Sequence, residues 1–169
     1  LGERVFNEVF PQLADALARG DLQARKQPTG YGSYTRQQFT PDYLDEVREA
    51  ALVLLYRLLF LFYAEDRLLL PARDARYAPY SVRGLRERVR DAMDAGRPWS
   101  STIDHLWRHL KGVFELVNLG DDAVGMPAYN GGLFDRARSP LLERTKVPDK
   151  VMAPIIDALS RRTEDLLRL

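Results

Sequence analysis

The most apolar stretch of the chain is residues 52–64, where Arg57 is the single charged residue. The stretch ends abruptly at an acidic and basic triplet, residues 65–67. It is too short to cross a bilayer, which requires about 20 apolar residues. A helix that is apolar around most of its circumference needs other elements packed around it. The pattern therefore predicts an all-α fold, an irregular helical bundle around one central apolar helix at about residues 41–67.

Local signals define the start of this central helix. Thr40 is a favourable N-cap, Pro41 suits the first helical position, and Asp42 complements the positive end of the helix dipole. Pro71 lies beyond its predicted end.

Helical spacing of apolar residues predicts further helices on both sides. The N-terminal one is expected to bend or restart at Pro11 and to stop at Gly20. Its inward face is predicted to comprise Val5, Phe6, Val9, Leu13 and Leu17. Near the C-terminus a last helix is expected, with Pro148 and Pro154 limiting where it begins, and its apolar residues are Val151, Met152, Ile155, Ile156 and Leu159.

Two helices are predicted between these. Ser81 is expected to cap the first, whose inward residues are Leu85, Val89, Ala92 and Met93. Ser101 and Asp104 resemble a capping box for the second. That helix should end at Gly120 and bury Ile103, Leu106, Trp107, Leu110, Val113, Phe114 and Val117. We expect all of these to surround the central helix.

Two segments lack helical periodicity. Residues 27–34 are rich in tyrosine and glycine and are predicted to be a surface loop suited to binding. Residues 121–140 are irregular and contain an Asn-Gly-Gly turn.

Composition is that of an ordinary globular protein. The chain has 169 residues, 46% of them hydrophobic and 29% charged, which predicts a single helical domain over residues 1–169. The absence of cysteine excludes disulfides and thiolate chemistry and fits a cytoplasmic protein. The chain begins at Leu1 without a methionine or a signal-peptide pattern, so we expect it to be a piece of a longer protein.

Charge gives a weak indication of nucleic-acid binding. The net charge is +1, which predicts no strong attraction to DNA. The densest basic cluster contains Arg83, Arg86 and Arg90, which are therefore candidate DNA contacts, although Glu87 and Asp91 are interleaved with them.

Three groups of residues are candidates for chemistry. His105 and His109 stand four residues apart and can share a metal ion, but no third ligand is identifiable, so surface or interface histidines are the favoured interpretation. Glu65, Asp66 and Arg67 suggest either a general acid or base or, preferably, a network of ion pairs and helix caps with Arg57 and Arg67 as cations.

The third group is the turn at Tyr129, Asn130, Gly131 and Gly132, which we interpret as structural rather than as a phosphate cradle. We expect it to pack near residues 65–67. If Gly131 has positive φ, Gly131→Val should destabilise the fold by more than about 1 kcal/mol.

Two motifs taken together are more specific than any of these groups. They are residues 54–71, LLYRLLFLFYAEDRLLLP, and residues 127–135, PAYNGGLFD, with WRHLKGVF at 107–114 between them. The chain resembles, over roughly residues 40–160, the helical region ahead of the adenine-specific DNA methyltransferase domain in single-chain type IIG restriction-modification enzymes and related phage-defence proteins.

The resemblance implies a parent protein that binds DNA and S-adenosylmethionine, with the methyltransferase domain downstream and any nuclease domain upstream. The methyl-transfer motif of that family, an Asn/Asp-Pro-Pro-aromatic loop, is absent, because proline follows none of Asn7, Asn118 and Asn130. A glycine-rich turn for the cofactor is absent as well. No catalytic, cofactor-binding or metal-binding residue is therefore assigned, and the carried-over structural motif consists of Arg57, Glu65, Asp66, Arg67, Tyr129, Asn130, Gly131 and Gly132.

Three hypotheses follow. The first is a non-catalytic helical connector that positions DNA for a methyltransferase. The second is a stand-alone protein-interaction module that uses the tyrosine-rich loop or the region of Trp99 and Trp107. The third is a small metallohydrolase built on the two histidines.

Overall fold

A computed structural model of the chain describes residues 2–24, 39–129 and 131–167. This part is helical, without a β-strand, and the nearest approach to one is an isolated bridge between Asp121 and Met126. The predicted all-α class is therefore confirmed. The elements are α1 (Gly2–Ala24), α2 (Pro41–Asp66), η2 (Ala78–Tyr80), α3 (Val82–Asp94), α4 (His105–Leu119), η3 (Arg136–Arg138), α5 (Pro140–Arg144) and α6 (Asp149–Leu167).

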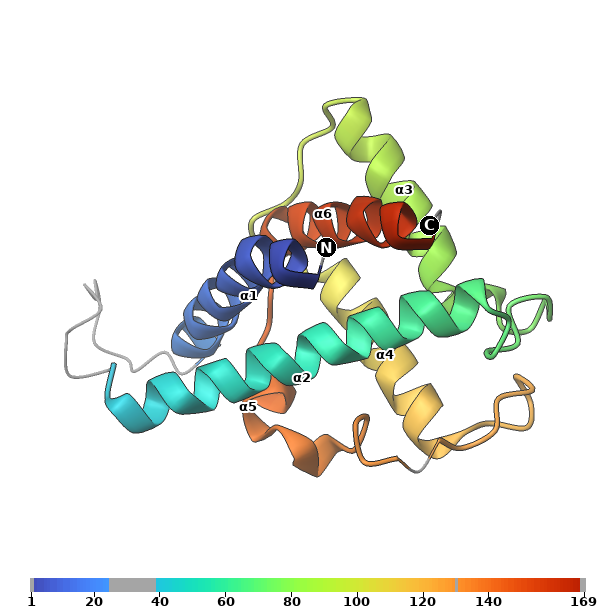
Figure 1. Cartoon of the computed structure of the whole chain (residues 1–169), viewed down its shortest axis with the longest axis horizontal. Coiled ribbons are helices and arrows are strands. Elements are labelled where there is room, and N and C mark those ends of the chain that lie inside the picture. The colour runs from blue at the N-terminus through green and yellow to red at the C-terminus, as the bar shows by residue number, and fades with distance from the viewer. Residues whose placement is uncertain (1, 25–38, 130, 168–169) are drawn as a thin grey trace.

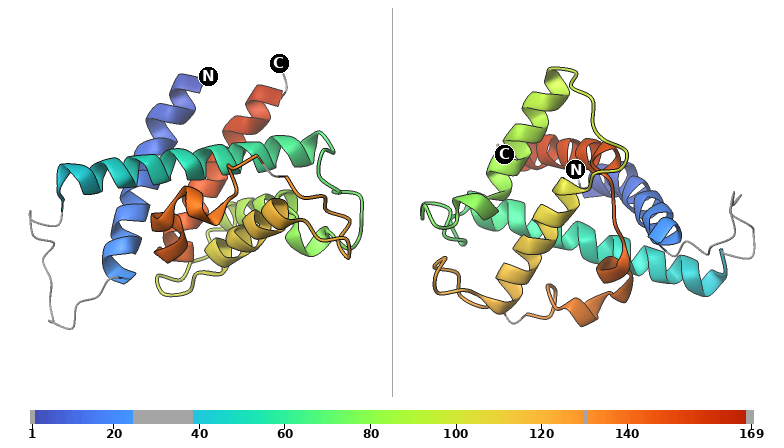
Figure 2. Two further views of the ribbon diagram at one scale, coloured as in Figure 1. Left: turned by 90° about the horizontal axis from the view of Figure 1, so that it is seen from below. Right: turned by 180° about the vertical axis from the view of Figure 1, so that it is seen from behind.

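Helix α2 is the longest element and runs across the whole molecule (Figure 1). Helices α1 and α6 cross it and pack against each other, while α3 packs on α6 and α2, and α5 lies against α1 and α2. The N-terminal end of α1 and the C-terminal end of α6 project to the same side of the molecule (Figure 2). Helices α3 and α4 lie on the opposite side of α2 (Figure 2).

The boundaries of α2 agree with the prediction. The Thr40 hydroxyl accepts a hydrogen bond from Tyr43 N at 3.2 Å, and Pro41 occupies the first turn. The helix ends at Asp66, and the chain then reverses through Leu68, whose φ is 57°.

Burial of α2 is less complete than its sequence predicts. Leu55 and Leu61 are inaccessible, at 3% and 0% exposure, but Tyr56 and Tyr63 are 54% and 48% exposed. These two tyrosines are seven residues apart and so lie on one side of the helix, which α1, α5 and α6 leave uncovered. The prediction that α2 is buried on nearly all sides is wrong for this side, because a tyrosine tolerates half exposure through its polar hydroxyl.

Helix α1 is continuous where breaks were predicted. It passes through both Pro11 and Gly20, and packing of Val9 and Leu13, each fully buried, outweighs the local cost of the proline. A Cβ at Gly20 would lie 2.5 Å from the carbonyl oxygen of Lys146. The glycine therefore permits a close approach between two chain segments and does not end the helix.

The start of α4 also differs from the prediction. Asp104 precedes the helix without a side-chain capping bond, and Ile103 is 44% exposed. The buried carboxylate of Asp149, at the start of α6, accepts from Leu106 N at 2.9 Å instead. A cap supplied from 43 residues away leaves no local signal.

The remaining predictions on helices α3 and α6 hold in part. The Ser81 hydroxyl caps α3 by accepting from Gly84 N at 3.1 Å, as expected. Helix α6 begins directly after Pro148 but continues through Pro154, which does not limit its start.

The tyrosine-rich segment 27–34 lies outside the described residues. Within the described ranges, every helix is too short or too polar to cross a membrane.

Candidate functional site

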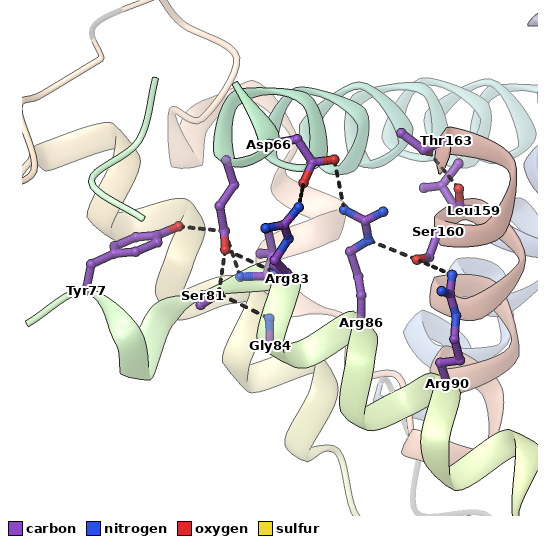
Figure 3. A network of polar contacts seen from close by, with 12 residues as sticks. Asp66, Tyr77, Ser81, Arg83, Gly84, Arg86, Arg90, Leu159, Ser160 and Thr163 are labelled. Carbon is purple, nitrogen blue, oxygen red and sulfur yellow. Dashed lines mark hydrogen bonds and ion pairs between the residues drawn. The ribbon is translucent and has the colours of Figure 1, made fainter. Parts of the chain in front are cut away.

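Glu65, in the last turn of α2, is the centre of a buried polar network. Figure 3 shows Asp66, Tyr77 and Ser81, which belong to this network. Its carboxylate accepts from Val82 N at 2.8 Å and from Arg83 N at 3.1 Å, the first backbone amides of α3. It also accepts from Tyr77 Oη at 3.1 Å and from the hydroxyl of Ser81. Glu65 is thus a side-chain cap on the positive end of α3.

The surroundings of Glu65 favour the structural interpretation over a general acid or base. Burial and the neighbouring carboxylate raise the pKa of Tyr77, so its phenol remains a hydrogen-bond donor to Glu65. Four hydrogen-bond donors, all from residues 77–83, occupy both carboxylate oxygens of Glu65. The Glu65 carboxylate therefore joins the end of α2 to the start of α3.

Asp66 forms the ion-pair part of the network. It lies 3.3 Å from the guanidinium of Arg83 and 3.5 Å from that of Arg86. The sequence predicted such a network but named Arg57 and Arg67 as its cations, which is wrong. Arg67 instead lies over the ring of Tyr63, 5.5 Å from its centroid.

Arg86 is an internal residue that ties α3 to two other helices. It is 5% exposed, donates from Nε to Ser160 Oγ at 2.9 Å, and lies 4.4 Å from the ring centroid of Phe62. Arg90 Nη2 donates to the same Ser160 hydroxyl at 3.4 Å.

This geometry changes the predicted DNA patch. Arg83 keeps 64% of its side chain exposed and Arg90 is half-buried, but Arg86 is 5% exposed and its guanidinium is engaged by Asp66 and Ser160. The three arginines line a cavity of about 160 Å³ together with Asp66, Glu87 and Ser160. The carboxylates of Asp66 and Glu87 therefore offset part of the positive charge of the arginines in this cavity.

Arg57 is the second buried arginine, at 2% exposure. Its Nε donates to the carbonyl oxygen of Leu133 at 2.7 Å and its Nη2 to that of Asp135 at 3.0 Å. The guanidinium lies 5.1 Å from the ring centroid of Phe114 and 5.8 Å from that of Phe134. Burial lowers the pKa of Arg57, partly offset by Glu143 and Asp135.

Tyr129, which precedes the predicted turn, contacts α2 and the segment just after residues 65–67. Tyr129 Oη donates to the carbonyl oxygen of Leu69 at 2.7 Å, and its ring meets Phe60 edge-on at 6.1 Å. The bond to Leu69 lies two residues beyond Arg67, so the neighbourhood of Tyr129 agrees with the predicted position of the turn. Gly131 is exposed and a Cβ there would meet open space, while Gly132 has a φ of 80°. Asn130 lies outside the described residues.

The two histidines do not form a metal site with other residues. His105 is exposed, and His109 is half-buried with Nε2 3.3 Å from the carbonyl oxygen of Tyr80. Across the described ranges, no group of three histidine, aspartate or glutamate side chains could hold a metal ion. Trp107 is 1% exposed and donates to the Thr145 carbonyl, so it offers no surface to a partner.

Sequence reasoning missed Ser160 and Asp149, the polar partners that α6 supplies to α3 and α4. Ser160 directly follows the buried Leu159 and is itself 1% exposed. A hydroxyl adjoining an apolar helical stripe signals a buried hydrogen bond, although it does not identify the partner.

Comparison with known proteins adds no relative: no family model, curated protein or solved structure matches this chain. The contacts described above therefore have to support any functional assignment.

Proposed function

We propose that the chain is a non-catalytic helical connector that positions DNA beside the adenine-specific, S-adenosylmethionine-dependent methyltransferase domain of a restriction-modification protein. The observation that carries the proposal is the environment of Arg57, a residue of the 54–71 motif. Its guanidinium donates to two carbonyl oxygens of the 127–135 motif and faces the ring of Phe114, from the 107–114 motif.

This convergence supports the resemblance in a physical way. The three segments are separated by up to 78 residues in sequence, yet one buried side chain contacts all of them. A chance match of composition would not require the matched segments to contact one another. The motifs behave as one structural unit, which is what a family resemblance predicts.

The fold suits a mechanical role. Enzymes that modify a base in duplex DNA extrude it from the helix and must hold the duplex meanwhile. Helix α2 spans 26 residues, or about 39 Å at 1.5 Å per residue, and α1 and α6 brace it from one side. Such an arm can hold a neighbouring domain and DNA at a fixed separation.

DNA contact in this proposal is modest. Arg83 and Arg90 offer positive charge at the edge of α3, while Asp66 and Glu87 lie in the same cavity. We expect weak, sequence-independent binding that falls steeply with salt, because binding rests on counterion release at a few phosphates.

A titration of labelled duplex DNA with the purified chain tests the positioning role. Fluorescence anisotropy at low and moderate salt should show weak binding that Arg83→Ala and Arg90→Ala together reduce about tenfold at low salt. Arg136→Ala is the control, since its side chain is 70% exposed on η3, away from α3. Equal binding by the double variant and the control would disprove the assigned face. Tight, salt-resistant, sequence-dependent binding would mean that the chain reads bases directly.

The connector role has a separate test in the gene that encodes this chain. Sequence that follows residue 169 should encode a strand, a glycine-rich turn and an Asn-Pro-Pro-aromatic loop, which together bind S-adenosylmethionine and the target adenine. A continuation without them would reject the connector. The purified chain itself should neither bind S-adenosylmethionine nor methylate or cut DNA.

One observation favours the alternative of a stand-alone protein-interaction module. Tyr56 and Tyr63 on α2 and Leu68 and Leu69 after it are each about half exposed, from 47% to 56%. Exposed aromatic and aliphatic side chains that lie close together are typical of a surface that a partner covers. Size-exclusion chromatography with light scattering would support this alternative if Tyr56→Ser and Tyr63→Ser abolished an observed dimer.

A further inference from the structure

A pocket lies between α3 and the first half of α4, on the opposite side of α3 from the Asp66 network. Its volume is about 390 Å³, within the range of about 300–1,000 Å³ that is usual for small-molecule sites. The segment between the two helices contributes Pro98 and Trp99. The full lining is Leu85, Arg88, Val89, Ala92, Arg97, Pro98, Trp99, His105, Leu106 and His109.

The lining combines basic side chains with an apolar floor. Arg88, Arg97 and the two histidines supply every ionisable group, and no acidic residue lines the pocket. The smaller cavity on the Asp66 side, in contrast, contains two carboxylates. The charged residues of this pocket lining are therefore all basic, unlike those of the smaller cavity.

The two arginines are available to a ligand. Arg88 and Arg97 are both exposed, and neither makes an ion pair with any residue in the described part of the chain. On the same helix, Arg83 and Arg86 are paired with Asp66. A guanidinium binds carboxylate, phosphate or sulfonate groups through two parallel hydrogen bonds, so a pair of them favours an anionic group.

The aromatic wall is held in position. Trp99 is half-buried, and its Nε1 donates to the sulfur of Met93 at 3.3 Å, which limits rotation of the indole. Leu85 and Val89, 3% and 0% exposed, close the floor. An indole fixed beside an apolar floor suits a planar ring, which can stack on it or meet it edge-on.

We propose that this pocket binds a small organic anion that carries a planar aromatic group, with the anionic group held by the exposed guanidinium of Arg88 or of Arg97 and the ring against Trp99. The inference is independent of any role in DNA positioning, because it requires neither DNA nor a neighbouring domain. His109 forms the inner wall and is anchored to the Tyr80 carbonyl.

Titration with 8-anilinonaphthalene-1-sulfonate tests the proposal on the whole chain. This probe has an aromatic body, a single sulfonate and a fluorescence that rises on binding. We expect one saturable site per chain, at least tenfold weaker binding of the neutral analogue N-phenyl-1-naphthylamine, and little competition by sulfate. Those results would show that charge and ring are both required.

Variants locate the site. Arg88→Ala with Arg97→Ala, and separately Trp99→Ala, should each weaken binding at least tenfold. Arg73→Ala is the matched control, since Arg73 is an exposed arginine outside the pocket lining. Near-ultraviolet circular dichroism verifies that each variant is folded.

Two outcomes would overturn the proposal. The first is unchanged binding by the folded arginine and tryptophan variants, which would place the probe elsewhere, for example on the Tyr56 and Tyr63 side of α2. The second is equal affinity for the neutral analogue, which would show that the pocket selects apolar surface and not an anion.

Discussion

Arg57 and Leu133 are joined by a hydrogen bond of 2.7 Å between the guanidinium Nε and the main-chain carbonyl, across 76 residues of sequence. The contact fixes an irregular loop to the middle of α2. No carboxylate is hydrogen-bonded to this guanidinium in the described part of the chain; its direct acceptors are carbonyl oxygens, and the faces of Phe114 and Phe134 lie nearby. Ring faces carry partial negative charge, so they compensate part of the lost hydration.

Replacement of Arg57 should therefore destabilise the fold. Arg57→Met roughly keeps the volume but leaves two partly buried carbonyl groups without their donor, and we expect the free energy of unfolding to fall by about 1–3 kcal/mol. Arg57→Lys should also destabilise, because an ammonium lacks the planar fork that reaches both carbonyls. Urea denaturation measures both. Arg48→Met, on the exposed part of the same helix, should change stability by less than about 0.5 kcal/mol. Equal stability of the Arg57 and Arg48 variants would contradict this role.

A second prediction concerns the cap of α3. Glu65→Gln retains the shape of the side chain but removes the charge that faces the helix N-terminus, and should cost about 1–3 kcal/mol. Ser81→Ala removes a donor to Glu65 and the acceptor for Gly84 N, and should cost about 1 kcal/mol. Because the two side chains share a hydrogen bond, their effects in the double variant should be less than additive. Glu87→Gln on the exposed side of α3 is the control, and strict additivity would argue against coupling.

Local sequence signals predicted those features that depend on neighbouring residues. Thr40, Pro41 and Ser81 act within a few residues of their targets, so the helix starts they define were predicted correctly. The cap that Asp149 gives to Leu106 connects distant segments and leaves no pattern in either one.

The same distinction applies to the candidate site. The sequence indicated a buried carboxylate network at residues 65–67, since charges directly after an apolar run require partners. The sequence did not indicate which arginines pair with these carboxylates. Arg83 and Arg86 have the pattern of surface residues, and they meet Asp66 only because α3 packs beside α2. Burial of Arg86 in turn depends on Ser160 from α6.

The glycines give a third prediction, which revises the expectation for Gly131. A Cβ at Gly131 would meet open space, so Gly131→Ala should change stability little. A Cβ at Gly120 would lie 2.6 Å from Ala128 N, and φ there is 70°, so Gly120→Ala should cost more than about 1 kcal/mol. Gly132→Ala should fall between them, since its φ is 80° but its surroundings are open. Thermal melts of the three variants test this order, and a large loss for Gly131→Ala alone would reverse it.

The last prediction concerns pH. Burial lowers the pKa of His109 in the folded chain, and Arg88 lowers it further, while the carbonyl of Tyr80 and the charge of Glu65 act in the opposite direction. The unfolded chain, with a histidine pKa of about 6.5, therefore binds a proton more readily than the folded chain does. The contribution of His109 to stability is present above about pH 6.5 and is lost as the pH falls through the folded pKa.

The free energy of unfolding should accordingly decrease between about pH 7.5 and pH 5.5, and His109→Gln should make that decrease smaller. Urea titrations at several pH values in this range measure the slope. His105→Gln is the matched control, because it replaces an exposed histidine on the same helix. A slope that His109→Gln does not alter would show that acidic groups elsewhere, and not this histidine, determine the response to pH.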